Sequence, residues 1–314
     1  FDESSKLKNM KSKVTKAATD VSWSPGVKEV YLLTGTPCPN DPTEIWTQLN
    51  LLSQEDAGGS FWKFAYHFMK PDEETVFLKG GRTKKVIKGW NFKSERHETA
   101  FYDHLGKRNW FLDKRDCLDL PAVTDKVHRF ALSSKEMKAY RLAEKEAQLL
   151  IEKKGLESAS LQQLTSAGIF AKLRQLTGGR AISESGITVI GSSKLEAMSE
   201  ILDELASQPV VIWAEYRASI DAIAEVLEDR GTKYGILDGR TKEPGEIVSQ
   251  FVAGETMAII AHPQSAGHGV DGLQRRASDA IFYEQGFSSE LHEQARDRIP
   301  VSYTHLTLPT IYSV

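Results

Sequence analysis

The second half of the chain alternates short, continuously apolar runs with segments of helical periodicity. Residues 209–214 (PVVIWA) and 257–261 (MAIIA) are apolar throughout, as expected of strands buried on both faces. Strands of this kind that alternate with helices predict a parallel sheet covered by helices on both sides, with ligands at the carboxyl ends of the strands. The predicted strands are residues 209–214, 233–237, 257–261 and 280–283, and the predicted helices are residues 218–229, 247–252 and 288–299.

The first half of the chain is less regular. Residues 29–33 (EVYLL) predict a strand that ends at the turn TGTP, and Asp41, Pro42 and Glu44 form a helix start that resembles a capping box. Aromatic-rich helical segments over residues 61–106 are interrupted by LKGGRTKKVIKGW, whose glycines and cationic side chains predict an exposed hairpin or loop. The whole pattern indicates an α/β protein. Two further helices are predicted at residues 133–153 and 158–176.

Composition narrows the class of protein. A chain of 314 residues, with 40% hydrophobic and 26% charged residues, is long enough for about two globular domains. Cys38 and Cys117 match neither a disulfide framework nor a metal site, and we expect them to be inert packing residues in a reducing cytoplasm. Every apolar run falls far short of the roughly 18 residues of a membrane helix. The formal charge of −3 argues against a protein that coats nucleic acid nonspecifically, although local basic stretches could still bind phosphates.

Two polar motifs carry the candidate chemistry. Asp2 and Glu3 form the kind of pair with which nucleotide triphosphatases hold Mg²⁺ through the aspartate and orient the attacking water with the glutamate. The turn Thr34, Gly35 and Thr36 follows after one helix-sized connection, as adjacent parallel strands would require. Its hydroxyls could hydrogen-bond a neighbouring carboxylate, and its glycine allows close backbone approach. Either motif alone is a weak indication of a nucleotide triphosphatase, but the two together are a much more specific one.

The order of these and later motifs resembles the Swi/Snf-like DNA-dependent ATPases of the second helicase superfamily, particularly the short bacterial and phage-encoded members. The acidic pair is followed by Lys8 and Asn9, and the TGTP turn is followed by Asn40. The resemblance continues, in the order of the family, to residue 299. The matching segments are EIWTQLNLL (44–52), CLDLPAVTDKVHRFALSSKEMKAY (117–140), AKLRQLTGG (171–179), SSKLEAMSEIL (192–202), HPQSAGHGVDGLQ (262–274) and ELHEQARDRI (290–299).

The resemblance implies two RecA-like parallel-sheet domains around an ATP cleft, with double-stranded DNA lying across both. Residues 1–125 would be the C-terminal part of a truncated first domain with a helical and basic insertion, and residues 126–299 would be the second domain. ATP and Mg²⁺ would be the cofactors. Asp2 would bind Mg²⁺ through water, Glu3 would activate the attacking water, and residues 34–36 would link the nucleotide state to the grip on DNA. The expected compartment is the cytoplasm of a bacterial or phage-infected cell.

In the second domain, the SAGHGVDG segment matches the motif that contacts DNA and the nucleotide sugar in the family. By that match Ser265, Gly267, Gly269 and Asp271 are candidate nucleotide- or DNA-binding residues, and the two glycines would allow close approach to a phosphate. The family shows a glycine where His268 stands and an asparagine near Asp271. We therefore expect His268 to be a variant loop residue rather than a metal ligand or a catalytic base.

The last motif matches the family only in part. Gln294 and Arg298 fit, but Val301 stands where the family has its arginine finger, a residue typically worth about 10³ to 10⁵ in rate. The 314 residues also contain no GxxxxGK[ST] phosphate-binding loop. We therefore expect that the chain is incomplete at both ends, that its parent protein is an ATP-driven translocase on double-stranded DNA, and that this polypeptide alone hydrolyses ATP poorly.

The composition changes abruptly after residue 299. Residues 300–314 (PVSYTHLTLPTIYSV) contain no Asp, Glu, Lys or Arg, directly after a charge-dense segment. We expect this stretch to be a non-native tail, because it resembles the translated adapter sequences that can remain on assembled genes. The alternative is a genuine terminal strand, for which Val, Tyr, Thr, Leu and Ile are suitable residues.

Two basic stretches are candidate contacts for the DNA backbone. Lys6 and Lys8 lie in the first, and Arg82, Lys84 and Lys85 lie in the second, within the glycine-rich insertion and near Trp90. Backbone contacts predict binding that weakens steeply with salt and ignores base sequence, whereas a solvated face would show neither. The first stretch also contains Lys11, Lys13 and Lys16, and the second also contains Lys88.

Two other functions are compatible with parts of the sequence, and a third is not supported by it. An RNA helicase of the same superfamily would typically carry Ser-Ala-Thr where this chain has Thr-Gly-Thr-Pro. A truncated domain that binds DNA or a partner without turnover would require both chain ends to be genuine. A nuclease finds no support in any Asp/Glu/Lys constellation of the chain.

Overall fold

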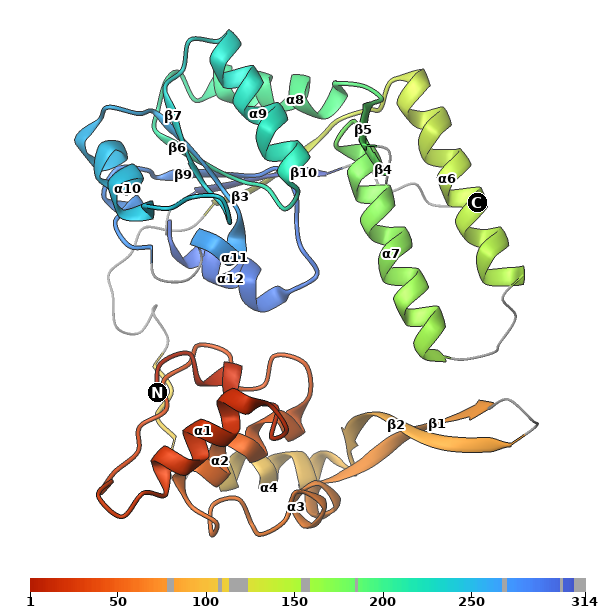
Figure 1. Cartoon of the computed structure of the whole chain (residues 1–314), viewed down its shortest axis with the longest axis vertical. Helices are drawn as coiled ribbons and strands as arrows, with labels where there is room; N and C mark the ends of the chain where they lie inside the picture. Colours follow the sequence, from red (N-terminus) through yellow and green to blue (C-terminus); the bar gives the residue numbers. More distant parts are fainter. Residues whose placement is uncertain are drawn as a thin grey trace. The chain divides into compact units, whose positions relative to one another are not determined.

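The computed structural model describes residues 1–77, 82–106, 109–112, 124–153, 159–183, 186–266, 270–299 and 302–307. The chain forms two compact units, Phe1–Asp116 and Cys117–Val314, drawn in Figure 1. The boundary between them falls earlier in the chain than the predicted division after residue 125. Among the helices in these described ranges, none is long and apolar enough to span a bilayer.

The second unit is built on a six-stranded sheet in which every pairing is parallel. The strand order is β3-β10-β9-β6-β8-β7. Successive strands along the chain are not sheet neighbours throughout, so helical crossovers connect them. The strands are β3 (Thr124–Arg129), β6 (Val210–Trp213), β7 (Tyr234–Leu237), β8 (Ala258–Ala261), β9 (Asp279–Phe282) and β10 (Ser302–Thr307).

The central strands of this sheet are buried on both faces. Val210 and Ile212 of β6 pack into one hydrophobic cluster with α8 and α9, whereas Val211 and Trp213 pack into a second cluster with α10 and α12. Figure 1 shows α8 and α9 on one side of the sheet and α11 and α12 on the other. This doubly covered parallel sheet confirms the α/β fold that the apolar runs predict. The helices are α8 (Ser193–Glu204), α9 (Arg217–Asp229), α10 (Pro244–Ala253), α11 (Pro263–Ala266) and α12 (Ser289–Asp297).

A helical hairpin precedes the core of the second unit. It consists of α6 (Ser134–Lys153) and α7 (Ala159–Thr177), which pack against each other and match the two predicted helices closely. A small antiparallel pair, β4 (Arg180–Ser183) and β5 (Gly186–Val189), follows. Neither this pair nor β3 is predicted from the sequence, because their residues do not form a continuous apolar run.

The segment after residue 299 contributes a strand to the sheet. β10 lies between β3 and β9 and pairs in parallel with both, with Tyr303 opposite Asp125 and Ala280. This is the arrangement expected under the terminal-strand alternative. A strand can form from any suitable sequence, whatever its origin, so the expectation that residues 300–314 are non-native stays a prediction.

The first unit packs short helices against a long antiparallel hairpin. Phe64 and Phe68 of α3, Trp90 of β2, and Phe101 and Leu105 of α4 share one buried cluster, which explains the aromatic-rich pattern of residues 61–106. Figure 1 shows β1 and β2 extending away from these helices. The elements are η1 (Ser4–Leu7), α1 (Lys13–Ser22), η2 (Pro42–Glu44), α2 (Ile45–Leu52), α3 (Phe61–Phe68), β1 (Met69–Phe77), β2 (Thr83–Phe92) and α4 (Glu95–Gly106).

The helix that starts near Asp41 begins as predicted, with one difference. The Asp41 carboxylate accepts a hydrogen bond from the backbone N–H of Thr43 (2.8 Å), and Pro42 occupies the first helical turn. In a capping box the Glu44 carboxylate would accept from the backbone N–H of Asp41. It accepts instead from the N–H of Asn40 (3.2 Å) and from the Asn40 side-chain amide (3.0 Å), so Glu44 holds the turn before the helix.

Candidate functional site

The acidic pair and the TGTP turn lie at the ends of two adjacent backbone segments. The amino group of Phe1 donates to Tyr31 O (2.7 Å), the N–H of Leu33 donates to Phe1 O (2.9 Å), and the N–H of Ser4 donates to Leu33 O (2.9 Å). The first segment donates, then accepts, then donates again, while both segments run in the same direction. This is the hydrogen-bond pattern of a parallel ladder. The predicted adjacency of Asp2 and Thr34 is therefore present.

Residues 29–33 nevertheless do not form a regular strand, so that prediction is wrong in its strict form. Their ladder with the segment from Phe1 to Ser4 is three bonds long. The side chains of Tyr31 and Leu33 are 70% and 61% exposed. An apolar run without a covering layer gains little from burial, and a parallel pair this short is not enough to define a sheet.

Glu3 has an unusual backbone conformation. Its φ and ψ are 51° and 50°, in the left-handed region, and among the described residues only Ala206 and Ser207 share a positive φ without being glycine. The Glu3 N–H donates to the Asp2 carboxylate (2.9 Å), and Glu3 O accepts from the N–H of Lys6 (3.0 Å). This backbone conformation costs a non-glycine residue about 1–2 kcal/mol, and such strain concentrates at functional sites.

The TGTP turn is held by its own hydroxyl. Thr34 Oγ1 accepts from the backbone N–H of Thr36 (3.2 Å), and both side chains are half-buried. An accepting hydroxyl can still donate its proton, so this bond is compatible with the predicted contact to a carboxylate. Gly35 is exposed, and no heavy atom lies within 4 Å of the place that a Cβ would occupy.

We expect Gly35→Ala to leave the free energy of unfolding unchanged or to raise it by up to about 1 kcal/mol, because the new methyl meets open space and restricts the unfolded chain. Urea denaturation of both proteins measures this. The control is Gly179→Ala, where φ is 76° and the new Cβ would collide with the carbonyl oxygen of Gly191, so a large loss is expected. A loss of similar size at Gly35 would contradict the open space.

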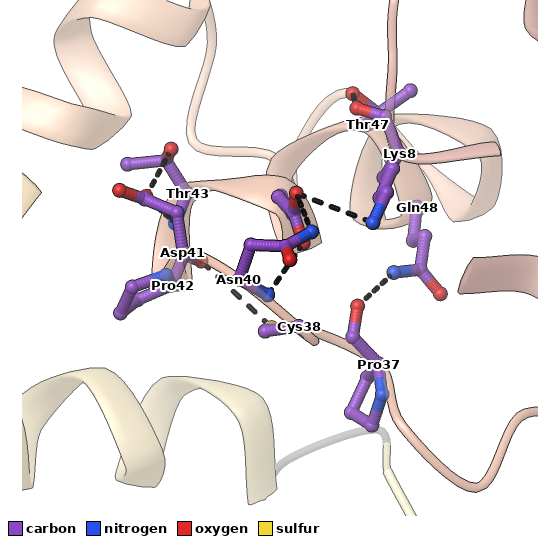
Figure 2. A network of polar contacts seen from close by, with 10 residues as sticks. Lys8, Pro37, Cys38, Asn40, Asp41, Pro42, Thr43, Thr47 and Gln48 are labelled. Atoms are coloured by element: carbon purple, nitrogen blue, oxygen red, sulfur yellow. Dashed lines mark hydrogen bonds and ion pairs between the residues drawn. The ribbon is translucent and has the colours of Figure 1, made fainter. Parts of the chain in front are cut away.

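Polar contacts just before the start of α2 anchor this region (Figure 2). Besides its bonds to Asn40, Glu44 forms an ion pair with Lys8 (Nζ to Oε1, 3.5 Å). Burial, and next to it the charge of Glu44, raises the pKa of the Cys38 thiol to about 11. Cys38 is thus a thiol rather than a reactive thiolate near pH 7, as predicted, whereas Cys117 lies outside the described residues.

The basic candidates of the first unit differ in their surroundings. Lys6 is exposed, and so are three other lysines of the first stretch, whereas Lys8 is half-buried against Glu44. Arg82, Lys84 and Lys85 are exposed at the hairpin, where Lys85 pairs across the strands with Glu73 (2.8 Å). Lys88 likewise pairs with Glu74. The three other exposed lysines are Lys11, Lys13 and Lys16.

In the second unit the predicted binding residues follow β8. Ser265 lies on α11, and its N–H donates to His262 O (3.0 Å). Gly267 and Gly269, with His268 between them, lie outside the described residues. Asp271 is exposed and borders a surface cavity of about 520 Å³ between α10 and residues 270–275. Ser265 and Asp271 therefore lie, along the chain, before and after residues 267–269, which the structure does not describe.

Gln294 lies on α12, and Arg298 caps its C-terminal end. Both side chains are half-buried. The hydrogen bond from Gln274 lowers the pKa of Asp271, and the charges of Arg275 and Arg298 lower it further. Arg298 and Asp271, predicted from separate motifs, are therefore close enough to interact electrostatically. Val301 lies outside the described residues.

A buried ionic cluster of the second unit is not predicted from the sequence. Glu284, 3% exposed, accepts from the N–H groups of Glu215 and Tyr216 (both 3.1 Å) and from Ser219 Oγ (2.7 Å), which fixes the start of α9. Lys194 is 6% exposed and lies over the ring of Tyr283, next along the chain to Glu284. The available signal was a carboxylate placed directly after the buried run AIFY.

Burial sets the pKa values of this pair. It lowers the pKa of Lys194 to about 8, although the charge of Glu284 acts in the opposite direction. It also raises the pKa of Glu284 above its usual value, although Lys194, Ser219 and two backbone N–H groups favour the carboxylate. Desolvation therefore outweighs the attraction between the two charges, and the cluster is held by hydrogen bonds as much as by charge.

Comparison with known proteins gives these motifs a context. A model of the SNF2-related domain matches residues 1–178, which is more than half of the chain. The chain belongs to the SNF2-related domain family. The match begins at the acidic pair and includes the TGTP turn, so both motifs of the first unit fall within the family's domain.

Relatives cover nearly the whole chain at low identity. Putative protein p41 of Acyrthosiphon pisum secondary endosymbiont phage 1 is 24% identical over 95% of this chain and 61% of its own length. The SWI/SNF chromatin-remodeling complex subunit snf22 of Schizosaccharomyces pombe is 23% identical over 95% of this chain and 18% of its own length. The chain thus spans less than two thirds of the length of these curated relatives.

A solved structure shows the same fold. The SWI2/SNF2 ATPase core of Sulfolobus solfataricus, solved in complex with double-stranded DNA, superposes with a TM-score of 0.51 at 20% identity, over 98% of this chain and 62% of that chain. The fold of this SNF2-family chain is therefore that of the RecA-like ATPase domains of the helicase superfamily.

Proposed function

We propose that this chain carries the magnesium-binding and water-activating motifs of an ATP-dependent double-stranded DNA translocase. The observation that supports this most directly is the three-bond ladder between the segment at Phe1 and residues 31–33. It brings Asp2, Glu3 and the TGTP turn to one edge, as the carboxyl ends of adjacent parallel strands require. Membership of the SNF2-related family makes an ATPase the expected chemistry for such an edge.

In this proposal Asp2 holds Mg²⁺ through water and Glu3 activates the attacking water. The donor set fits, because Mg²⁺ prefers oxygen ligands, keeps several waters, and commonly uses one or two carboxylates together with substrate phosphates. Asp2 is exposed, and the Glu3 N–H fixes the orientation of its carboxylate. When bound, Mg²⁺ supplies neutralisation of phosphate charge. Residues 34–36 would sense the nucleotide state beside these two carboxylates.

The second unit would supply contacts to the nucleotide and to DNA. Ser265, Gly267, Gly269 and Asp271 are proposed for the nucleotide sugar and the DNA backbone, and Gln294 and Arg298 for the catalytic cleft. The electrostatic proximity of Arg298 to Asp271 supports a shared role for the last two motifs. The proposed ligands of the complete protein are ATP, Mg²⁺ and double-stranded DNA.

The ATPase assay that tests the function has two arms. The 314-residue chain is expected to hydrolyse ATP poorly with or without DNA, because it contains no GxxxxGK[ST] sequence and has Val301 at the finger position. The product of the complete gene, obtained by sequencing the source DNA across both ends, is expected to show turnover stimulated by duplex DNA more than by duplex RNA. Strong turnover by the chain alone would contradict the first arm, and preference for RNA would favour an RNA helicase. A complete product with no turnover would favour a noncatalytic binding domain.

Binding to DNA tests the proposed partner directly. We expect the chain to bind duplex DNA of any sequence with an affinity that falls steeply as salt rises. Replacing Lys6, Lys11, Lys13 and Lys16 with glutamine should reduce the slope of log affinity against log salt by roughly one for each phosphate that is no longer neutralised. Fluorescence anisotropy at several salt concentrations measures this. Lys28→Gln, at another exposed lysine of the same unit, is the control and should leave the slope unchanged.

An affinity that hardly depends on salt would contradict a backbone-phosphate role for these lysines. The hairpin offers an internal comparison, because Lys85 and Lys88 are already paired with Glu73 and Glu74. Charges that are paired across the hairpin contribute less net attraction to a polyanion. Substitutions there should therefore change the slope less than the substitutions in the first basic stretch.

A further inference from the structure

A buried amide connects the two turns of the candidate site. Gln48, on α2, is 3% exposed. Ser4 Oγ donates to its Oε1 (2.8 Å), and its Nε2 donates to Pro37 O (2.6 Å). Ser4 directly follows Glu3, and Pro37 directly follows Thr36. Figure 2 shows the Gln48 side chain reaching from the helix to Pro37.

Two side chains near Gln48, Thr47 of α2 and Glu44 of η2, contact the flanks of both turns. Thr47 Oγ1 donates to Lys8 O (3.0 Å), and Glu44 binds Asn40 and Lys8. Glu44 ends η2 directly before α2, three and four positions ahead of Thr47 and Gln48, so the three side chains lie near one another. Ile45 and Leu49 of α2 pack into the aromatic core, which keeps the helix in place.

The amide at position 48 does what an apolar side chain of the same size could not. Its two polar ends have partners on two different segments, and Ser4 is fully buried. Removing the amide would leave the buried Ser4 hydroxyl without its acceptor and the Pro37 carbonyl without this donor. Buried polar groups that lose their partners lower the free energy of unfolding. If either turn moved by much more than about 1 Å, one of these two hydrogen bonds would break.

We propose that Gln48 is a positioning residue that couples the Glu3 turn to the TGTP turn, so that a shift of one is transmitted to the other through its amide. This inference rests on the proposed function, in which the two turns bind the nucleotide and sense its state. Gln48 contacts neither ligand; it acts by keeping the carboxylates and the Thr34 hydroxyl in register.

Hydrogen exchange of the 314-residue chain tests the coupling without any ligand. Gln48→Met keeps the length of the side chain and removes the amide. Exchange at the backbone N–H groups of Ser4 and Leu33 should become about tenfold faster, and residues 31–40 and 1–9 should both be affected. Thr47→Val, which removes only the bond to Lys8 O, is the matched control and should leave residues 31–40 unchanged.

Two exchange results would overturn the inference: no change at residues 31–40 in Gln48→Met, or an equal change in Thr47→Val, which would indicate general loosening of α2. If Gln48→Met does not fold, Ser4→Ala removes one arm of the bridge and should produce the same pattern more weakly. Unchanged exchange at residues 31–40 in Ser4→Ala would then overturn it.

Steady-state kinetics of the complete gene product test the consequence for turnover. Gln48→Met should lower DNA-stimulated kcat about tenfold while KM for ATP and the affinity for DNA stay within twofold, because the residue touches neither ligand. Thr47→Val should retain wild-type kcat. If the wild-type product shows no turnover with any nucleic acid, the proposed function is wrong. The coupling through Gln48 is then judged by the hydrogen-exchange result only. If the wild type is stimulated by DNA and Gln48→Met equals it, the coupling is wrong.

Discussion

Replacing Glu284 with alanine is expected to lower the free energy of unfolding of the second unit by about 3 kcal/mol or more, because each donor left without its acceptor costs about 1–3 kcal/mol. The carboxylate accepts two backbone N–H groups at the start of α9 and the hydroxyl of Ser219. Its loss would leave those donors unsatisfied and Lys194 buried without its opposing charge. Urea denaturation followed by circular dichroism measures the change.

The control for this substitution is Glu200→Ala. The Glu200 side chain is 72% exposed and lies 4.0 Å from His128, so its loss should change the free energy of unfolding by less than about 0.5 kcal/mol. Adding Lys194→Met to Glu284→Ala should recover part of the loss, because the uncompensated charge is then absent. A loss below about 1 kcal/mol in Glu284→Ala would contradict the importance of the Glu284 hydrogen bonds, and no recovery in the double variant would contradict an electrostatic interaction with Lys194.

The pH dependence of stability has a definite sign at Lys194. Burial lowers its pKa in the folded chain to about 8, from 10.5 in the unfolded chain. Between these values the unfolded chain binds more protons, so this group makes stability rise as pH increases from about 8 towards 10.5. Glu284, whose pKa is raised by burial, makes stability fall as pH rises from 4.5 through its folded pKa. Lys194→Met should abolish the rise in the alkaline range, and an unchanged rise would contradict this assignment.

The central strands of the second unit could be predicted because each is a local apolar run. β6, β8 and β9 are buried on both faces, so burial alone marks them in the sequence. β3 (TDKVHR) is an edge strand with mostly exposed residues, and its position depends on pairing with β10, far away in the chain. β3 therefore carries little apolar signal and is not revealed by the sequence pattern, whereas β7 at the other edge of the sheet is an apolar run (YGIL) and is predicted.

The candidate site shows the same division between local and long-range information. The acidic pair and the TGTP turn could be predicted from residue types and spacing, and the structure brings them together. Gln48 contacts Ser4, 44 residues away, and Glu284 contacts Ser219, 65 residues away. Bonds of this kind depend on how helices pack, and a polar residue within an otherwise amphipathic helix gives no sign of its partner. Buried polar residues next to a predicted motif are the places where the structure adds most.

The water-activating role proposed for Glu3 leads to the largest effect expected on turnover. In the complete gene product, Glu3→Gln should reduce DNA-stimulated ATP hydrolysis by about 10² to 10⁴, the contribution typical of a general base, with little change in binding of ATP. Glu55→Gln is the control, because Glu55 is an exposed carboxylate of the same unit. A Glu3→Gln protein with more than about a tenth of wild-type turnover would mean that another group activates the water.

A second substitution at the same position separates chemistry from strain. Glu3 has φ 51° and ψ 50°, a conformation that costs a non-glycine residue about 1–2 kcal/mol. Glu3→Gly removes that cost and adds about 0.5–1 kcal/mol of backbone entropy loss on folding, so a net gain of up to about 1 kcal/mol in the free energy of unfolding is expected. Turnover should be lost as in Glu3→Gln. A glycine variant that is both less stable and less active would show that the Glu3 side chain stabilises the fold. A variant with higher stability and lost turnover would show that the strained backbone lowers stability and that the Glu3 carboxylate is needed for turnover.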